Sequence, residues 1–479
     1  MLFNSLNFLL FFPVVTALYY LVPHRFRWPL LLLASCIFYM AYIPIYILIL
    51  AATILIDYFA ALLIDKSEGR AKKIWLNISI LSTVAILFVF KYFNFFNDNI
   101  DAIAKLLDWN YSKVILRLAL PIGLSFHTFQ SLSYVIEVYR GNQKPERNFG
   151  IYALYVMFYP QLVAGPIERP QNLLWQFHKE HTFSIQQVSS GLFRMMWGFF
   201  KKIVIADRLS IYVGMVYDHP GKDNGITVIL ATIFFTFQIY CDFSGYSDIA
   251  LGAAEVMGIK LMRNFNRPFA SKNISEFWQR FHISLSSWFY DYIFNPIVAA
   301  WRRWDSVAIV LGLMITFLIS GIWHGAGWTF VTYGFVNGLG ISLLFITARF
   351  RKKLFGKIPA KLINPVNILL NFEFVCFTYV FFRAKSIHDS MILLSSMMHG
   401  FNLKMPFNSQ IATIEDLVII LVMVPLMLLF EKLYDDNPFF NICKEKPLII
   451  QWATAWIGLF IIFNFGAFTD AHSFIYFKF

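Results

Sequence analysis

The sequence predicts an all-α, polytopic membrane helical bundle. Hydrophobic residues make up 58% of its 479 residues and charged residues only 14%, whereas soluble domains carry about 25% charged residues. A single soluble core stops growing near about 250–300 residues, so a chain this apolar needs lipid to cover its surface. Apolar runs of about 20 residues, the length that crosses a bilayer as a helix, recur along the whole sequence.

The apolar runs divide the chain into candidate membrane spans with no linker or boundary between them. We therefore predict one transmembrane domain over residues 1–479, with eleven crossings and additional interfacial or re-entrant helices around a central tunnel. Charged residues interrupt the run at 188–216. The candidate spans are 6–22, 28–43, 45–64, 74–93, 114–138, 150–165, 188–216, 226–257, 307–322, 328–348, 363–384, 411–433 and 448–468.

The distribution of Lys and Arg predicts the orientation of the spans, because cytoplasmic loops carry an excess of both. Basic clusters follow the first, third and fifth candidate spans, and the densest cluster occupies 349–361. Alternation then places these loops in the cytoplasm, loop 94–113 outside, and both termini outside. The first 23 residues contain no Lys or Arg, so we expect residues 7–22 to form a membrane helix and not a cleavable signal.

Charge and cysteine usage exclude several classes of protein. The net charge of +12 comes from short clusters between apolar runs, which fits membrane topology better than nucleic-acid binding. The four cysteines are far apart in the sequence, so neither a disulfide framework nor a zinc site is indicated. Histidines with metal-ligand spacing are absent, and we predict no metal.

The strongest motif is Gly321-Ile-Trp-His-Gly-Ala-Gly-Trp328, which lies between two apolar runs. An ionisable residue at membrane depth is costly and marks a functional site by default. Flanking glycines permit irregular backbone, which survives there only when packed in protein or lining a cavity. A desolvated imidazole stays neutral and can accept a proton, so His324 is a candidate general base. The alternative is a loop histidine hydrogen-bonded at the membrane interface.

Segment 271–299 is too polar to span the membrane and too apolar for a free loop. Asn273 can cap a helix, and Glu276 three residues later completes a capping-box-like pattern. We predict one amphipathic helix at the membrane interface over 277–294. It carries His282, Ser286 and Asp291, whose alternative role is to form the wet face of that helix.

A third polar group interrupts the run at 226–257. It contains Asp242, Tyr246 and Asp248, and charged residues in a span face the bundle interior or water. Substrate binding and structural hydrogen bonding both remain open for them.

Several motifs, taken in order, resemble the membrane-bound O-acyltransferase family, in the branch that O-acetylates exported bacterial polysaccharides. The resemblance covers nearly the whole chain, and the ordered set is far more specific than any one motif. The matching stretches are Leu120–Gln130, Phe158–Ile167, Asp242–Asp248, Asn264–Phe269, the segment around His282, the His324 motif and Phe474–Phe479.

The resemblance implies roles for individual residues. His324 matches the family's catalytic histidine, and His282 lies in its second conserved helix. Residues near them are expected to bind substrate: Trp323, Asp242, Tyr246, Asp248, Asp291 and Ser286. The sequence departs from the pattern where Tyr290 replaces the branch's usual Arg and where paired glycines are missing from 295–300, which leaves donor and acceptor identity open.

The resemblance also implies a reaction and a location in the bacterial inner membrane. The expected donor is acetyl-CoA or another acyl thioester on the cytoplasmic side, with no permanently bound cofactor. Arg302 and Arg303 are expected to attract its phosphates. A periplasmic serine-hydrolase-like partner is expected to complete transfer to an exported polysaccharide.

Two other kinds of function remain open. Within the family, the chain could transfer D-alanine to teichoic acid from a carrier-protein thioester. Outside it, a multi-span chain could be a transporter, which often has two related halves with interrupted spans, or a scaffold for a secreted protein. Substitution of His324 distinguishes them, because only catalysis requires its imidazole.

Overall fold

The computed structural model describes residues 1–399, 414–433, 446–468 and 474. All regular elements in these ranges are helical, which confirms the predicted class. Large apolar side chains on the outward helix faces are exposed, including Trp452, Trp456, Phe460 and Phe463 of α22 (Leu448–Phe465). A soluble protein rarely exposes apolar patches larger than a few hundred Å², so these faces are expected to contact lipid.

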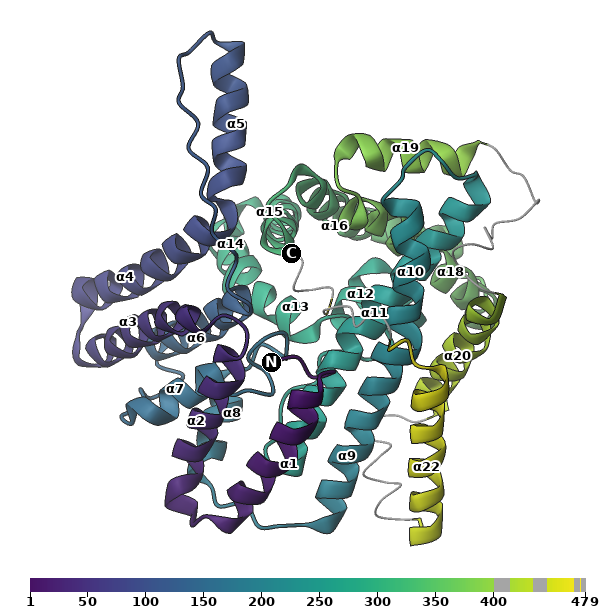
Figure 1. Cartoon of the computed structure of the whole chain (residues 1–479). Helices are drawn as coiled ribbons and strands as arrows, with labels where there is room; N and C mark the ends of the chain where they lie inside the picture. Colours follow the sequence, from purple (N-terminus) through teal and green to yellow (C-terminus); the bar gives the residue numbers. More distant parts are fainter. Residues whose placement is uncertain (400–413, 434–445, 469–473, 475–479) are drawn as a thin grey trace. The chain divides into compact units, whose positions relative to one another are not determined.

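The described chain forms two compact units. The first comprises Met1–Met195 and Tyr246–Met262. Its helices are α1 (Leu6–Leu21), η1 (His24–Phe26), α2 (Arg27–Met40), η2 (Pro44–Tyr46), α3 (Ile47–Lys66), α4 (Gly69–Leu87), η3 (Phe88–Tyr92), α5 (Phe93–Leu106), α6 (Leu124–Arg140), α7 (Phe149–Met157), α8 (Pro170–His178) and most of α9 (Ile185–Phe199). Figure 1 shows these elements in purple to blue.

The second unit comprises Met196–Gly245 and most residues after Arg263. The long helix α11 (Gly225–Val256) contributes to both units. The other helices of the second unit are η4 (Phe200–Ala206), α10 (Asp207–Tyr217), η5 (Pro268–Ala270), α12 (Ile274–Arg280), α13 (Ile283–Phe289), η6 (Tyr290–Phe294), α14 (Asn295–Ala300), η7 (Arg302–Trp304), α15 (Ser306–His324), α16 (Trp328–Ile346), α17 (Ala348–Phe355), α18 (Ala360–Arg383), α19 (Ile387–Met398), α20 (Ile414–Leu433) and α22.

The prediction of several membrane spans is confirmed, because the structure contains helices long and apolar enough to cross a membrane. By length and composition, seven segments among the described residues qualify, and α1 is a shorter apolar helix. The count of eleven crossings and the central tunnel stay predictions. The seven are Pro44–Lys66, Gly69–Leu106, Gly225–Val256, Ser306–His324, Trp328–Ile346, Ala360–Arg383 and Leu448–Phe465.

Two candidate spans of the first unit are helical over only part of their length. The segment 150–165 is helical only as far as Met157, because Pro160 disfavours helical backbone at the residue before it and cannot donate a backbone hydrogen bond. The segment 114–138 becomes helical only at Leu124. There Gly123 adopts a left-handed φ of 77°, and a Cβ at this position would lie 2.6 Å from the Leu162 carbonyl oxygen.

The irregular backbone after α7 is buried and hydrogen-bonded. The amide of Gly165 donates to the Gln161 carbonyl, and the amide of Tyr159 donates to Ser35 Oγ at 3.0 Å. Non-helical backbone at membrane depth is tolerated only when protein satisfies its polar groups in this way. The segment is therefore a packed loop in place of the predicted crossing.

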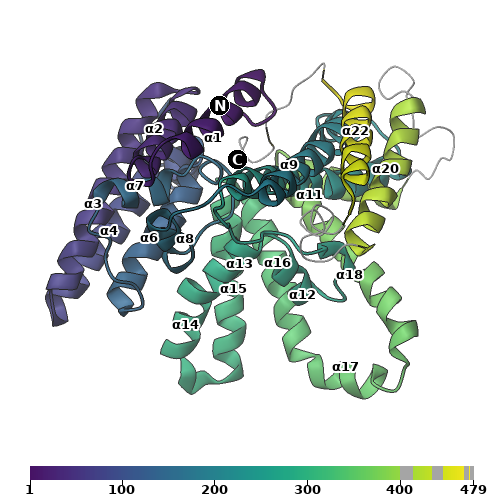
Figure 2. The same ribbon diagram turned by 90° about the horizontal axis from the view of Figure 1, so that it is seen from below.

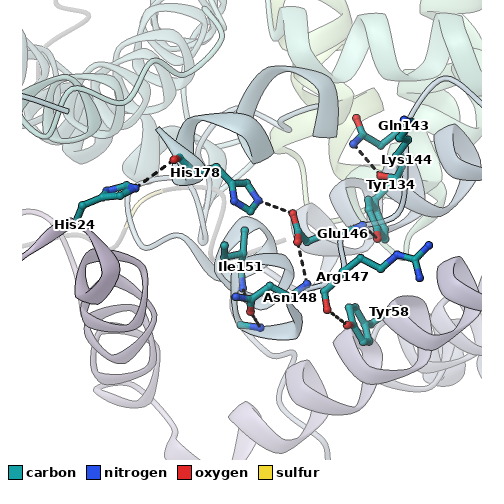
Figure 3. Close-up of polar contacts among 11 residues, drawn as sticks. His24, Tyr58, Tyr134, Gln143, Lys144, Glu146, Arg147, Asn148, Ile151 and His178 are labelled. Carbon is teal, nitrogen blue, oxygen red and sulfur yellow. Dashed lines mark hydrogen bonds and ion pairs between the residues drawn. The ribbon is translucent and has the colours of Figure 1, made fainter. Parts of the chain in front are cut away.

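A polar cluster fixes the loop between α6 and α7 within the first unit (Figure 3). Glu146 accepts from the Asn148 amide at 2.9 Å and lies 2.7 Å from His178 Nε2. The Glu146 amide donates to the Tyr134 hydroxyl, and the Tyr58 hydroxyl donates to the Arg147 carbonyl. These contacts join α3, α6 and α8 through one loop.

Within the second unit, α15 and α16 form an antiparallel hairpin whose helices pack side by side (Figure 1). Glycines allow the close approach: a Cβ at Gly321 would lie 2.3 Å from the Phe330 carbonyl oxygen, and one at Gly334 would lie 2.4 Å from that of Phe317. Small residues at such contacts are typical of helix packing in membranes. Figure 2 shows α17 between the far ends of α16 and α18.

Candidate active site

His324 is the last residue of α15, at the turn of this hairpin. Its side chain is 4% exposed. The ring of Phe382 lies edge-on at 5.3 Å between centroids, and that of Tyr333 at 5.9 Å. The hairpin therefore holds the imidazole in an aromatic environment from which water is largely excluded.

The glycines beside His324 serve close packing more than unusual dihedral angles. Gly325 has φ −163° and Gly327 has φ −169°, both extended conformations that any residue adopts. A Cβ at Gly325, however, would lie 2.1 Å from the Phe330 ring. Glycine is therefore required at position 325 because a side chain would clash with Phe330, and not because the backbone there is irregular as predicted.

His282 does not lie within one continuous amphipathic helix, so that prediction is wrong. The segment breaks at Phe281 and His282, between α12 and α13. The predicted cap at Asn273 is confirmed, because its side chain accepts from the Glu276 amide at 2.9 Å. His282 itself has φ 48° and ψ 52°, a left-handed conformation that costs a non-glycine residue about 1–3 kcal/mol and often occurs at functional sites.

His282 is fully buried. Burial lowers its pKa well below the usual value, and the neighbouring His324 lowers it further. The ring is therefore neutral near pH 7, as a proton acceptor must be.

The ring of Trp323 brings the two histidines into one cluster. Its centroid lies 4.9 Å from that of His324 and 6.1 Å from that of His282. Phe243 packs edge-on against His282 at 4.5 Å. The structure thus unites three sequence-predicted site residues in the second unit.

Asn264 belongs to the site, although its sequence context indicated no role for it beyond membership of a family motif. Its side-chain oxygen accepts from the amide and the hydroxyl of Ser284, at 3.2 and 2.9 Å, and lies 3.3 Å from His282 Nδ1. The signal available from the sequence was a polar residue between Arg263 and Phe265. Its partners lie about 20 residues further along the chain, beyond the reach of local pattern reasoning.

A cavity of about 780 Å³ lies beside this cluster. One face of α15 lines it from Ile309 to Ser320, and His324 is the next residue on that face because residues four apart are neighbours on a helix. Predicted Ser286 also lines the cavity, and its amide donates to the His282 carbonyl at 2.9 Å. The cavity therefore extends along α15 toward the turn that carries His324, although neither histidine lines it.

The opposite end of the cavity is basic. Ile341, Leu344 and Arg351 line it there, at the end of α16 that leads into α17. The guanidinium of Arg351 donates to the Leu344 carbonyl at 2.7 Å. Most other lining side chains are apolar, so the cavity fits a largely uncharged group.

Arg302 and Arg303 lie in η7, just before α15. Because α15 and α16 are antiparallel, the start of α15 and the end of α16 lie at the same end of the hairpin. These arginines are therefore at the basic end, but Arg351 lines the cavity and they do not. Tyr290 lines it as well, with its ring stacked on that of Phe294 at 5.5 Å. Asp291 lies beside Tyr290 in η6 and is half-buried.

The structure does not gather the aspartates of α11 into one site. Asp242 pairs with Lys202 at 2.6 Å within the second unit, and Lys202 also contacts Asp207 at 2.7 Å. Asp248 pairs with Arg194 at 3.1 Å within the first unit. Tyr246 is buried there with its ring stacked on Phe3. These contacts favour the structural alternative, and substrate binding by the three residues stays a prediction.

Comparison with known proteins identifies the family. The profile of the membrane-bound O-acyltransferase family matches residues 147–384, which include His282 and His324. The probable alginate O-acetylase AlgI of Pseudomonas aeruginosa is 35% identical over 401 residues, covering 83% of this chain and 75% of that protein. The chain belongs to the membrane-bound O-acyltransferase family. It is an acyltransferase.

Other relatives of this acyltransferase differ in the acceptor that their names state. The peptidoglycan O-acetyltransferase of Helicobacter pylori is 32% identical over 431 residues, covering 83% of this chain and 80% of that protein. The teichoic acid D-alanyltransferase of Bacillus subtilis is 27% identical over 274 residues, covering 56% of this chain and 69% of that protein. Similarity to the O-acetylating relatives thus extends over more of the chain.

Proposed function

We propose that this acyltransferase passes an acetyl group from a cytoplasmic thioester across the inner membrane, for O-acetylation of an exported or cell-surface polysaccharide. The observation that supports this most is the buried His282–Trp323–His324 cluster, next to an apolar cavity that runs along α15 and is lined by Arg351. The relatives named as O-acetylases match 83% of the chain, which favours acetyl over D-alanyl transfer.

The cavity separates the charged and uncharged portions of the proposed donor. The phosphates of acetyl-CoA would remain among the exposed side chains of Arg349, Lys352 and Lys353 on α17. The thioester would enter along α15 toward His324, in surroundings that hold little water. Water exclusion there would strengthen electrostatic interactions and limit hydrolysis.

The two histidines supply the proton transfers that the reaction needs. The acceptor hydroxyl oxygen attacks the thioester carbonyl carbon, so that a C–O bond forms and the C–S bond breaks. His324 takes the hydroxyl proton as general base and returns it to the departing thiolate. A periplasmic serine-hydrolase-like partner would carry the acetyl group on to the polysaccharide.

Inside-out membrane vesicles that contain the chain should test both the reaction and its orientation. Labelled acetyl-CoA added outside such vesicles reaches the former cytoplasmic face, so label should accumulate on acceptor inside them. Right-side-out vesicles given the same donor should accumulate none. Equal labelling in both preparations would contradict transfer across the membrane, and labelling only from a D-alanyl carrier protein would favour the teichoic acid alternative.

Reversing the charge of Lys352 and Lys353 should weaken donor binding. The double Glu variant should have a higher KM for acetyl-CoA at low salt, because the basic end no longer attracts its phosphates. The increase should shrink as ionic strength rises, since exposed charges are screened within about 10 Å at 0.1 M salt. Initial rates at several donor and salt concentrations measure this effect.

The matched control makes the same charge change elsewhere. Lys66 and Arg70, exposed at the α3–α4 turn, belong to another predicted cytoplasmic loop. Their double Glu variant should leave the KM for acetyl-CoA nearly unchanged. An equal increase from both variants would assign the effect to overall charge and exclude α17 as the entry site.

A further inference from the structure

The side-chain amide of Asn264 lies where it controls the chemical state of His282. Asn264 is 1% exposed, and His282 and Ser284 are fully buried. Backbone bonds fix the two segments together: the Ile283 amide donates to the Asn264 carbonyl at 2.9 Å, and the Asn266 amide donates to the Arg280 carbonyl at 2.8 Å. The amide and the imidazole therefore face each other in one rigid arrangement.

The contact with Ser284 determines which atom of the Asn264 amide faces His282. The backbone amide of Ser284 can only donate a hydrogen bond, and it lies 3.2 Å from this atom. The atom must therefore be the oxygen, since a side-chain NH₂ group cannot accept. Networks of this kind are the basis on which amide orientation and histidine tautomers are assigned.

The tautomer of His282 then follows from the same oxygen. An amide oxygen carries no proton, so the His282 Nδ1 atom 3.3 Å away must be the N–H donor. In a neutral imidazole the other ring nitrogen is then the acceptor. His282 thus carries its lone pair on Nε2.

We propose that Asn264 is a positioning residue that holds His282 in the Nδ1–H tautomer, so that Nε2 serves as a proton acceptor in acyl transfer. This inference rests on the proposed function and extends it, because it gives the second histidine a defined chemical role beside His324. The left-handed backbone at His282 supports it, since the surroundings must enforce a conformation that costs free energy.

The titratable and charged groups around His282 determine how a substitution at position 264 would shift its pKa. His324 of α15 is the titratable group that acts on it, and the rings of Trp323 and Phe243 contact it. Asp242, next to Phe243 on α11, is paired with Lys202. A carboxylate at position 264 would therefore add a negative charge directly against Nδ1–H.

Asn264→Asp should change the pH dependence of catalysis while keeping the shape of the site. The carboxylate still accepts from Ser284 and His282, but it favours the protonated imidazolium and raises its pKa. The acid limb of kcat/KM should move to higher pH by about one unit or more. Activity lost on the acid side should return as the pH rises and His282 again loses its proton.

Ser284→Ala is the matched control. It removes the hydroxyl that donates to Asn264 at 2.9 Å but keeps the backbone amide and the contact with His282. Its pH profile should match that of the unchanged protein. If Asn264 has only a structural role, the acid limb of kcat/KM should stay unchanged in Asn264→Asp as well. That result would overturn the proposal.

A direct measurement of the tautomer does not depend on activity. Solid-state ¹⁵N NMR of histidine-labelled protein in bilayers, with His282→Gln to identify the signal, should show a protonated Nδ1 and an unprotonated Nε2. A protonated Nε2 would overturn the inference even if acetyl transfer is observed. If the tautomer is as expected but no acetyl transfer occurs with any donor, the proposed function fails and the structural role of Asn264 stands.

Discussion

His324→Gln should lower the rate of acyl transfer by about 10²–10⁴-fold, the usual contribution of a general base. Glutamine has a similar size and can form hydrogen bonds in the same place, but it cannot take a proton from a hydroxyl. The side chain is 4% exposed, so water is poorly placed to substitute for it. Single-turnover assays of the purified protein in lipid nanodiscs, with acetyl-CoA and the acceptor, measure the loss.

Membrane insertion and Tm of the same preparations serve as the control, because a lower rate could also come from an unstable protein. His324→Gln and His324→Ala should both insert in the membrane, and the Gln variant should have nearly the unchanged Tm. His282→Ala should also reduce the rate, because it removes the proton acceptor proposed at Nε2. An active His324→Gln variant would make His324 structural, and a dead His282 variant beside an active His324 variant would reverse the two roles.

The sequence predicted helices well where the bilayer alone dictates them. The run at 307–322 became α15 (Ser306–His324), and that at 328–348 became α16 (Trp328–Ile346). In lipid every backbone polar group must be satisfied internally, so a long apolar run has few alternatives to a helix. The same reasoning placed His324 at a turn between two spans.

The sequence prediction failed for the span at 150–165, where a proline interrupts an apolar run. Pro160 interrupts the apolar run after α7, yet the run was read as a span because most of its residues are apolar. The buried loop there depends on partners distant in sequence, such as Ser35 for the Tyr159 amide. Hydropathy does not encode such contacts.

The sequence predicted several residues of the candidate site, but not the hydrogen bonds and ion pairs between them. The break at His282 depends on contacts with Asn264, 18 residues earlier, so a local pattern of polar and aromatic residues suggested an unbroken helix. Asp242 and Asp248 were grouped because they lie on one run. Their partners, Lys202 and Arg194, come from the segment at 188–216 whose charges had made it the least regular candidate span.

Lys202→Met should strongly destabilise the protein. Lys202 and both of its carboxylate partners are nearly inaccessible, with side chains 1–4% exposed, and the ammonium group lies 4.6 Å from the centre of the Phe474 ring. Removing one member of a buried ion pair leaves an uncompensated charge, at a typical cost of about 3–5 kcal/mol in the free energy of unfolding. A large fall in Tm, followed by scanning fluorimetry in detergent, is the expected result.

Asp207→Asn should have a much smaller effect on Tm than Lys202→Met, although both change one member of the same cluster. Lys202 faces two carboxylates, so the variant leaves it paired with Asp242 at 2.6 Å. Asp242→Asn should resemble Asp207→Asn in stability, because Lys202 then keeps Asp207. Activity distinguishes the remaining role of Asp242: a structural residue loses acyl transfer only in proportion to Tm, whereas a substrate-binding one raises KM with an unchanged Tm. Equal Tm values for Lys202→Met and Asp207→Asn would contradict a cluster in which two carboxylates share Lys202.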